Sequence, residues 1–366
     1  MKDQEDCEIP FQPLDAKVAL GQMPILKSPR ILGDFVLWLE QRPNEGGRIT
    51  ACIRPWFSSD CFPQELSPAP MNLRSRVHDY GGGVIAAEIE EDVLWLVFID
   101  DYHNCLWQQL FEIQPLKKLK ASNSSFCKPL EPIICLAEFG EYKLADGYLD
   151  MKRRRWVGVM ESDHKDFLVS FTLNKEKQIP QIIYSPNSFV GYATQSPDSS
   201  QMAWVEWQET DMPWDASQLW HGSLNDSGQI IHKKLLAGNA VNPEKKTSVF
   251  QPIWLPTGEL VVSNDQSGWW NLMITCPDND ASPELQWLSP WPQKAETAMP
   301  QWVYGMSTAS ASGKNVLSAS CSEGSWEMKL LNMNGLMHTI NQPFDDLADI
   351  HADKERAVAI ASNSCV

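Results

Sequence analysis

Short runs of alternating apolar and polar residues, separated by turn residues, follow one another along the whole chain. Alternation with a period of two is typical of half-buried strands, and helical periodicity is weak nearly everywhere. One unit recurs, in which a polar turn precedes four to six alternating residues and another polar turn. Its seven copies lie at 33–39, 91–97, 154–160, 197–205, 256–262, 312–318 and 353–360.

The spacing of these copies indicates the architecture. They begin roughly 40 to 65 residues apart, the range of a four-stranded propeller blade. A β-sandwich with chance similarity among its hairpins is the alternative, but its strands recur at about 8–12 residues without a longer period. We therefore predict an all-β, seven-bladed β-propeller. The residues expected on equivalent strands are Val36, Val93, Val157, Met202, Leu260, Val316 and Val358.

The last copy of the unit lies close to the end of the chain. It begins at Asp353, roughly 14 residues before Val366, whereas one blade needs about 40. We expect a lead-in segment at 1–19 and a propeller domain at 20–366 that is truncated within its seventh blade. Its second strand, near Val358, then has an unpaired edge.

Composition and charge limit the classes of molecule that the protein is expected to bind. The 366 residues are 43% hydrophobic, with 16 Trp and 25 Pro, which suits many short strands and tight turns. The formal net charge is −17, and the longest basic run, 152–155, is interpreted as a turn at a strand edge. Nucleic acid and anionic membranes are therefore excluded as expected partners.

The first residues and the cysteines indicate the compartment. Residues 1–13 are acidic and polar, unlike a signal peptide, and the longest apolar run, 93–99, is too short to cross a bilayer. The nine cysteines are irregularly spaced and contain no C-x-x-C. We expect reduced thiols in a cytoplasmic protein, with no cofactor and no metal site.

Four segments, in order, carry a resemblance to a known family. They are R-S-R-V-H-D-Y-G-G-G at 74–83, the S-P-D to M-P-W-D stretch at 196–215, F-Q-P-I-W to G-W-W-N-L at 250–272, and P-Q-W-V-Y-G-M-S-T at 300–308. Together they resemble the propeller of acylaminoacyl-peptidase and dipeptidyl-aminopeptidase-like members of the prolyl oligopeptidase family of serine peptidases. The resemblance covers about residues 20–360. Two departures are Asp79, where the family has Glu, and Ser199-Ser200, which replaces the family's turn.

The family's catalytic α/β-hydrolase domain has no counterpart in this sequence. A nucleophile elbow needs G-x-S-x-G, and the nearest stretch, around Ser307, lacks it and has no helical pattern after it. His338 and His351 are interpreted as surface or turn residues rather than members of a triad. The three glycines at 81–83 lack the strand, helix and Lys-Ser/Thr of a phosphate loop, and we interpret them as a flexible turn between the first two blades.

The resemblance implies a role for loops at one end of the propeller. In the family, that end faces the hydrolase domain and restricts the size of the peptide substrate. Domain contact or substrate contact is therefore expected at seven residues, although packing between blades is an alternative role for the first four. They are Arg76, His78, Asp79, Tyr80, Trp214, Trp269 and Trp270.

Two classes of function remain open from the sequence. In the first, the chain is the gating and docking half of a serine peptidase that cleaves short peptides from a free or acylated N-terminus, with a hydrolase domain as its partner and no catalytic residue of its own. In the second, it is a standalone interaction scaffold. A periplasmic scaffold is disfavoured by the polar N-terminus.

Overall fold

The structure, a computed structural model, describes residues 23–57, 61–114, 125–238, 246–275 and 287–363. The N-terminal lead-in segment, 1–19, therefore lies outside the described residues. Within them the protein is all-β apart from two short 3₁₀ turns, η1 (Pro43–Glu45) and η2 (Val77–Asp79). No helix in these ranges is long and apolar enough to cross a membrane.

The first three sheets are antiparallel and follow the chain order. The first contains β1 (Ile25–Leu32), β2 (Phe35–Arg42), β3 (Arg48–Pro55) and β4 (Gln64–Glu65). The second contains β5 (Ile85–Glu90), β6 (Val93–Asp100), β7 (Cys105–Ile113), β8 (Cys127–Pro129) and β9 (Ile134–Glu138), the last two both paired with β7. The third contains β10 (Lys143–Asp150), β11 (Arg155–Ser162), β12 (Lys165–Thr172) and β13 (Gln181–Tyr184).

The remaining sheets repeat the same connectivity. The fourth contains β14 (Phe189–Gln195), β15 (Gln201–Trp207), β16 (Gln218–Leu224) and β17 (Ile230–Gly238). The fifth contains β18 (Val249–Trp254), β19 (Leu260–Asn264) and β20 (Asn271–Thr275). The sixth contains β21 (Ala309–Ser312), β22 (Asn315–Ser322), β23 (Ser325–Leu331) and β24 (Met337–Ile340), and the last contains only β25 (Asp346–Ala352) and β26 (Ala357–Ser362).

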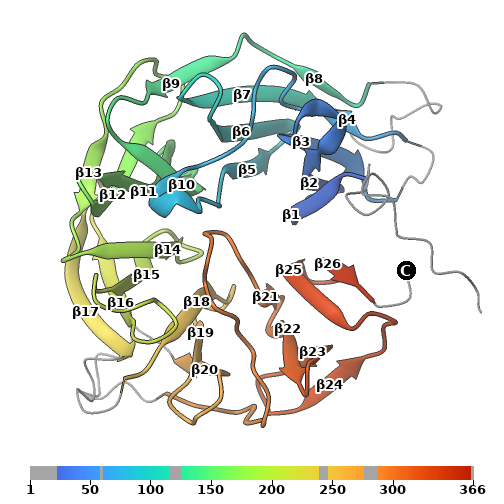
Figure 1. The fold of residues 1–366 in the computed structure, drawn as a ribbon, viewed down its shortest axis with the longest axis vertical. Helices are drawn as coiled ribbons and strands as arrows, with labels where there is room; N and C mark the ends of the chain where they lie inside the picture. Colours follow the sequence, from blue (N-terminus) through green and yellow to red (C-terminus); the bar gives the residue numbers. More distant parts are fainter. Residues whose placement is uncertain (1–22, 58–60, 115–124, 239–245, 276–286, 364–366) are drawn as a thin grey trace, which may run out of the picture.

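The sheets are arranged as the blades of a propeller around a common central axis (Figure 1). The first strand of each sheet lies nearest the centre of the ring. Six sheets have three to five strands and count as blades, and β25–β26 is a two-stranded sheet between the sixth and the first. The propeller prediction is confirmed, whereas the count of seven blades stays an interpretation.

The seven residues expected on equivalent strands all lie on the second strand of their sheets, β2, β6, β11, β15, β19, β22 and β26. The second strand has a partner strand on both sides in the six blades, and two of these strands, β15 and β19, are buried along their whole length. The basic run at 152–155 forms the turn between β10 and β11, as predicted, up to Arg155, the first residue of β11.

The hydrophobic core is a chain of clusters, each shared by neighbouring sheets. One joins the first three sheets, the next the third to the fifth, and two smaller ones continue to β25 and β26. Its largest fully buried side chains include Trp156, Trp204 and Trp291. Packing between blades therefore buries the tryptophans that are so frequent in the sequence.

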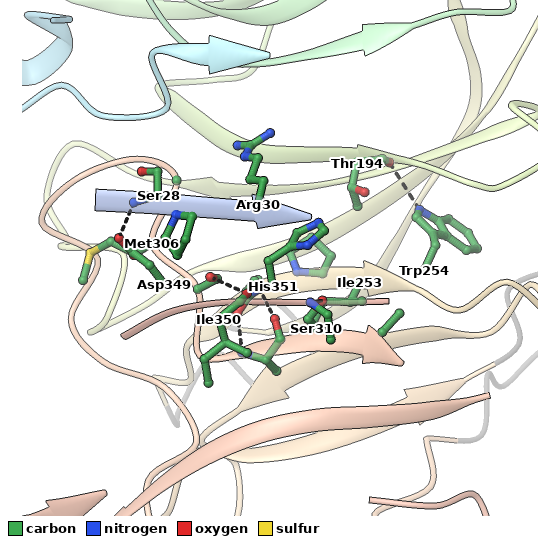
Figure 2. A pocket seen from close by; sticks show the side chains of 18 of the residues that line it. Ser28, Arg30, Thr194, Ile253, Trp254, Met306, Ser310, Asp349, Ile350 and His351 are labelled. Atoms are coloured by element: carbon green, nitrogen blue, oxygen red, sulfur yellow. Dashed lines mark hydrogen bonds between the residues drawn. The ribbon is translucent and has the colours of Figure 1, made fainter. Parts of the chain in front are cut away.

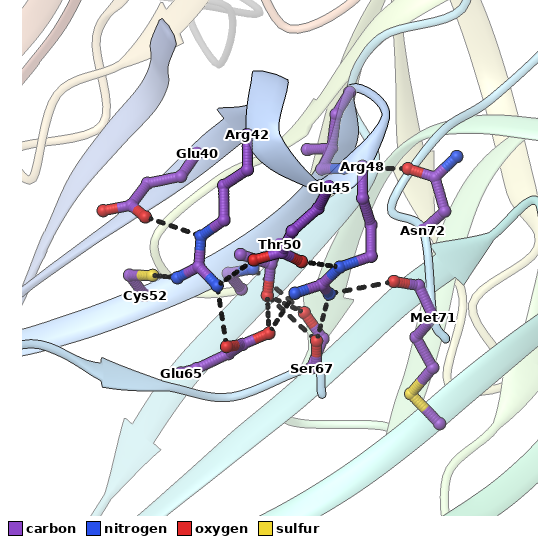
Figure 3. A network of polar contacts seen from close by, with 12 residues as sticks. Glu40, Arg42, Glu45, Arg48, Thr50, Cys52, Glu65, Ser67, Met71 and Asn72 are labelled. Atoms are coloured by element: carbon purple, nitrogen blue, oxygen red, sulfur yellow. Dashed lines mark hydrogen bonds and ion pairs between the residues drawn. The ribbon is translucent and has the colours of Figure 1, made fainter. Parts of the chain in front are cut away.

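An ionic network holds the outer edge of the first blade (Figure 3). The strand β4 has only two residues, so its ladder is short. Arg42 binds Glu40, Glu45 and Glu65 at 3.0, 3.1 and 2.8 Å, and Arg48 binds Glu45 at 2.5 Å and Glu65 at 2.6 Å. Because the carboxylate of Glu65 bridges both guanidinium groups, it ties β4 to the turn around η1.

Three buried cysteines act as apolar packing residues. Burial raises the pKa of the Cys52, Cys105 and Cys127 thiols to about 12. Thiolate formation is therefore suppressed at neutral pH, and these thiols are weak nucleophiles and weak metal ligands.

Candidate functional site

All seven candidate residues lie on loops at one end of the propeller. In an antiparallel blade, the turn between the second and third strands emerges at the same end as the connection to the next blade. The segments 66–84, 208–217 and 265–270 are such connections, after β4, β15 and β19 respectively. We call this end the loop face; the opposite end carries the turns between first and second strands.

Three aromatic rings, two of them exposed and the third half-buried, make contact on the loop face. The ring of Trp302 lies 5.6 Å from that of Tyr80 and 4.6 Å from that of Trp214. Tyr80 is 61% exposed and Trp302 is 50% exposed, and Met212, beside Trp214 in sequence, is 49% exposed. We call Tyr80, Trp214 and Trp302 the aromatic cluster. A connected apolar surface of this kind is typical of an interaction site.

The structure brings together two of the predicted residues, Tyr80 and Trp214, through Trp302, which sequence reasoning did not select. Trp302 lies on the connection between the fifth and sixth blades. The sequence feature that could have identified Trp302 is its place in the P-Q-W-V-Y-G-M segment. The three rings come from three separate parts of the chain, so no local pattern could join them.

The His78 side chain is half-buried and packs between the third and fourth blades. Its Nε2 lies 3.0 Å from Oδ1 of Asp166, and its backbone N–H donates to Oε2 of Glu161 at 2.7 Å. Its ring packs 4.9 Å from Phe189 and 6.2 Å from Trp207, in the fourth blade. Burial raises the pKa of Asp166, and the contact with His78 opposes that rise. Packing between blades is thus the role that these contacts support.

Arg76 and Asp79 lie on the surface of the loop face. The Arg76 guanidinium makes two hydrogen bonds to the carboxylate of Asp101, at 2.6 and 2.8 Å. The side chain of Asp79 is 95% exposed and lies 3.9 Å from Nζ of Lys143. Both side chains can therefore reach a partner, although Arg76 already has one carboxylate bound.

The predicted residues Trp269 and Trp270 lie in different environments. Trp269 is 39% exposed. Trp270 packs 6.0 Å from the buried ring of Phe250, and its backbone N–H donates to Glu296 at 2.8 Å. Among the described residues neither ring contacts the aromatic cluster. Trp269 thus remains a surface candidate, and Trp270 is a packing residue.

The glycines at 81–83 form a tight junction, which corrects the expected flexible turn. All three have positive φ, at 69°, 100° and 57°. A Cβ on the first would lie 2.2 Å from the Ser75 carbonyl oxygen, on the second 2.2 Å from that of Tyr304, and on the third 2.6 Å from Cα of Asp146. Glycine is required because the backbones of three segments meet here.

Two adjoining cavities lie along the inner strands. The larger, about 470 Å³, is lined by the first strands β1, β14, β18, β21 and β25 (Figure 2). The smaller, about 310 Å³, lies between β1 and the loop-face segments 72–84 and 303–306. Ser28, Asp349 and Met306 line both cavities, so the two adjoin. We call the larger cavity the channel, and the two cavities together the path to it from the loop face.

His351 lines the channel, which corrects its interpretation as a surface or turn residue. It lies on β25 and its Nδ1 accepts a hydrogen bond from the Ile31 N–H at 3.2 Å. Burial, followed by the charge of Arg30, lowers the pKa of His351 to about 4. It is therefore neutral at pH 7, as its acceptor role requires. His338, in contrast, is exposed on β24, as expected.

A repeated bulge in the inner strands was not visible in the sequence. Five first strands shift register against their second strands. In each shift, one residue other than glycine has φ between +50° and +55°. Such bulges re-aim side chains. These bulge residues are Ser28, Asp146, Tyr192, Gln251 and Asp349.

The bulge side chains connect successive sheets around the channel. Three of them accept hydrogen bonds from backbone N–H groups of the next sheet, at 2.5 to 3.0 Å. The pairs are Asp349 with Ser28, Asp146 with Tyr192, and Gln251 with Thr308. The signal that could have revealed them is position, because each bulge residue lies three or four residues before its strand ends.

Two further questions from the sequence concern Ser307 as a nucleophile and the binding of a metal ion. Ser307 Oγ donates a hydrogen bond to the Ile350 carbonyl at 2.9 Å, which fits the structural role expected for it. In the described ranges no group of three His, Cys, Asp or Glu side chains could hold a metal ion.

Comparison with known proteins gives a match in structure only. No protein-family model matches the chain, and no curated protein matches it. A puromycin hydrolase structure is 24% identical with a TM-score of 0.79, and the match covers 96% of this chain and 52% of that one. A puromycin-hydrolysing peptidase of Mycobacterium tuberculosis is 22% identical with a TM-score of 0.76, over 93% of this chain and 50% of the other.

A more distant match is prolyl oligopeptidase B from Galerina marginata. It is 12% identical with a TM-score of 0.60, over 93% of this chain and 47% of that one. The chain therefore has the fold of the propeller portion of these enzymes and spans about half their length. This agrees with the resemblance drawn from the four sequence segments.

Proposed function

We propose that this chain is the substrate-gating and docking propeller of a prolyl-oligopeptidase-like serine peptidase that acts on short peptides. The observation that carries the proposal is the structural match, which takes in at least 93% of this chain and only half of each peptidase. In this proposal β25 and β26 are the beginning of a seventh blade, and the catalytic residues belong to an α/β-hydrolase domain.

The aromatic cluster is the proposed docking surface for that domain. Its two exposed rings, Tyr80 and Trp302, lie on the loop face, and Tyr80 also lines the smaller cavity. A domain seated on this face would cover both the rings and the mouth of the path into the channel. Buried aromatic side chains at the centre of an interface usually contribute most to binding.

The channel supplies the proposed gating. Its walls are the first strands, whose bulge side chains connect one blade to the next. Cavities of about 470 and 310 Å³, enclosed by hydrogen-bonded strands, have room for small peptides and exclude folded proteins. This supports a preference for short peptides once the hydrolase domain is seated.

The proposal predicts that the purified chain is inactive. We expect no cleavage of chromogenic aminoacyl or acyl-aminoacyl substrates, and no labelling by a serine-directed fluorophosphonate, because the sequence has no nucleophile elbow. Ser307 is the position to inspect by mass spectrometry. Labelling of Ser307 or of any other serine would contradict this part of the proposal.

Docking is tested with the partner domain. The reading frame downstream of the Val366 codon is expected to encode a hydrolase domain with G-x-S-x-G. When that domain is produced separately, Trp302→Ala should weaken its binding by at least about 10-fold, since tryptophan hot spots contribute about 2 kcal/mol or more. Ile179→Ala is the control, because Ile179 is 87% exposed and lies between β12 and β13, at the opposite end.

The outcomes separate the two classes of function. Loss of binding with Trp302→Ala, but not with Ile179→Ala, supports the docking propeller. If no hydrolase frame follows and no hydrolase domain binds, the standalone interaction scaffold is the better conclusion.

A further inference from the structure

Three cationic side chains that have no hydrogen-bond partner among the described residues line the two cavities of a strongly acidic chain. The formal net charge is −17, yet Lys27, Arg30 and Arg74 line the two adjoining cavities. Arg30 lines the larger cavity, and Lys27 and Arg74 line the smaller one. Cations placed in this way point to an anionic ligand.

Arg30 is the most enclosed of the three. It follows the bulge at Ser28 on β1, and Figure 2 shows its side chain extending away from Asp349 without a dashed line to any residue drawn. Within the described ranges no acceptor forms a hydrogen bond or ion pair with its guanidinium. Arg30 is half-buried and lines a cavity, so its five donors are available to an anionic ligand.

The acidic groups that face Arg30 balance its charge only from a distance. They are Glu88, Asp146 and Asp349, and burial raises the pKa of each. Asp349 already accepts from the Ser28 N–H and Asp146 from the Tyr192 N–H. These carboxylates therefore limit how many negative charges the channel can accept, and they favour a ligand with one negative charge.

The dimensions of the path suit part of a small peptide. The cavities measure about 470 and 310 Å³, and both lie within the usual range for small-molecule sites. The smaller cavity reaches Tyr80 on the loop face, where the proposed hydrolase domain would sit. A peptide held there by its N-terminal part would direct its other end into the channel.

We propose that the channel binds the C-terminal α-carboxylate of a short peptide, with Arg30 as the principal donor. Lys27 and Arg74 line the way in and attract the same charge. A carboxylate matches the planar fork of arginine and forms two parallel hydrogen bonds with it. This inference rests on the proposed function, because it adds the anchoring end of the peptide substrate to that function.

The test compares a short peptide as its free acid with the same peptide as its C-terminal amide. Binding to the purified chain is followed by ligand-observed NMR titration, which detects weak complexes. We expect the amide to bind at least about 10-fold more weakly, since a hydrogen bond to a charged group contributes about 1.5–3 kcal/mol. Arg30→Met should weaken the free acid equally and abolish the difference between the two peptides.

The control variant is Arg154→Met. Arg154 is an exposed arginine that binds Glu90 at 2.7 Å, away from the cavities, and its loss should leave the preference for the free acid unchanged. Thermal unfolding of both variants shows whether they are folded. If Arg30→Met does not fold, Arg30→Lys gives the same test, because a lysine keeps the charge but loses the fork and should reduce the preference.

Several results would overturn the inference. They are equal binding of acid and amide, an unchanged preference in the folded Arg30 variants, and the absence of saturable binding of the free acid. Arg30-dependent binding of inorganic phosphate, without binding of the peptide acid, would assign the site to an inorganic anion instead. None of these results alters docking of the hydrolase domain through Trp302, so the two proposals can fail separately.

Discussion

At the scale of single residues, the channel shifts the pKa values of two titratable groups in opposite directions. Burial raises the pKa of Asp146 from 3.8 to about 6, and lowers that of His351 from 6.5 to about 4. Both groups are therefore held toward their neutral forms. Asp146 is charged when it loses a proton, whereas His351 is charged when it gains one. The free energy of unfolding therefore depends on pH in opposite directions for the two residues.

Asp146→Asn should remove a loss of stability that occurs as the pH rises. Between about pH 4 and 6 the unfolded chain releases this proton and the folded chain retains it, so the free energy of unfolding falls by up to about 3 kcal/mol. An asparagine Oδ1 can still accept from the Tyr192 N–H. We expect the variant to lack this slope in urea unfolding at pH 4 to 7. The exposed Asp163 supplies the control, Asp163→Asn, which should keep the slope.

His351→Asn should remove a loss of stability that occurs as the pH falls. As the pH falls from about 6.5 to 4, the unfolded chain binds a proton that the folded chain does not, and stability falls by up to about 3 kcal/mol. The asparagine oxygen can replace Nδ1 as acceptor for the Ile31 N–H. The same urea series, read from high to low pH, is the measurement. A wild-type slope in the variant would show that His351 is already protonated or solvated in the folded protein.

At the scale of elements, the bulged first strands hold the blades together. Gln251 gives the clearest case, because its Oε1 accepts from the N–H groups of Thr308 and Ala309 at 2.9 and 3.2 Å. Its Nε2 donates to the Ala309 carbonyl at 2.7 Å. One side chain thus satisfies three backbone groups at the junction of the fifth and sixth blades.

Gln251→Ala should destabilise the protein by about 2–4 kcal/mol, because it leaves these backbone groups without partners. Urea unfolding at constant pH measures the change. Gln178→Ala is the matched control, since the side chain of Gln178 also bonds three backbone groups, of Thr172 and Lys175, but does so on the surface and within its own segment. Equal stability of the two variants would contradict the role assigned to the bulge.

The same elements show how far the sequence could predict the fold. The second strands were found because each is a short, largely apolar run that follows a polar turn, as at Val157 and Leu260. The first strands were not resolved, because a bulge breaks the alternation, and a positive φ at Tyr192 leaves no mark in the sequence. The seven candidate residues lie together on the loop face, but contacts across blades, such as Trp214 with Trp302, depend on the closed ring.

At the scale of the whole molecule, the ring closes by packing rather than by strand pairing. Among the described strands β1 pairs only with β2, and β26 only with β25. Asp349 and His351 bind the backbone of β1 on the inner side. On the opposite end from the loop face, Arg356 donates to the Gly33 carbonyl at 2.6 Å and stacks 5.2 Å from the Trp56 ring. These few contacts join the last sheet to the first blade.

This closure predicts an uneven pattern of hydrogen exchange. Amides of β26 should exchange early, because no further strand among the described residues covers its outer edge, and a two-stranded sheet is marginal by itself. Amides of β25, which β1 covers, should exchange more slowly, and those of β19 at the centre of the fifth blade most slowly.

Arg356→Ala should accelerate exchange in both β25 and β1 and promote self-association through the exposed edge. Exchange mass spectrometry on a monomeric sample measures all three regions, with Arg154→Ala as the control. If β26 exchanged as slowly as β19 in that sample, another segment would have to cover its edge, and the proposed incomplete blade would be wrong.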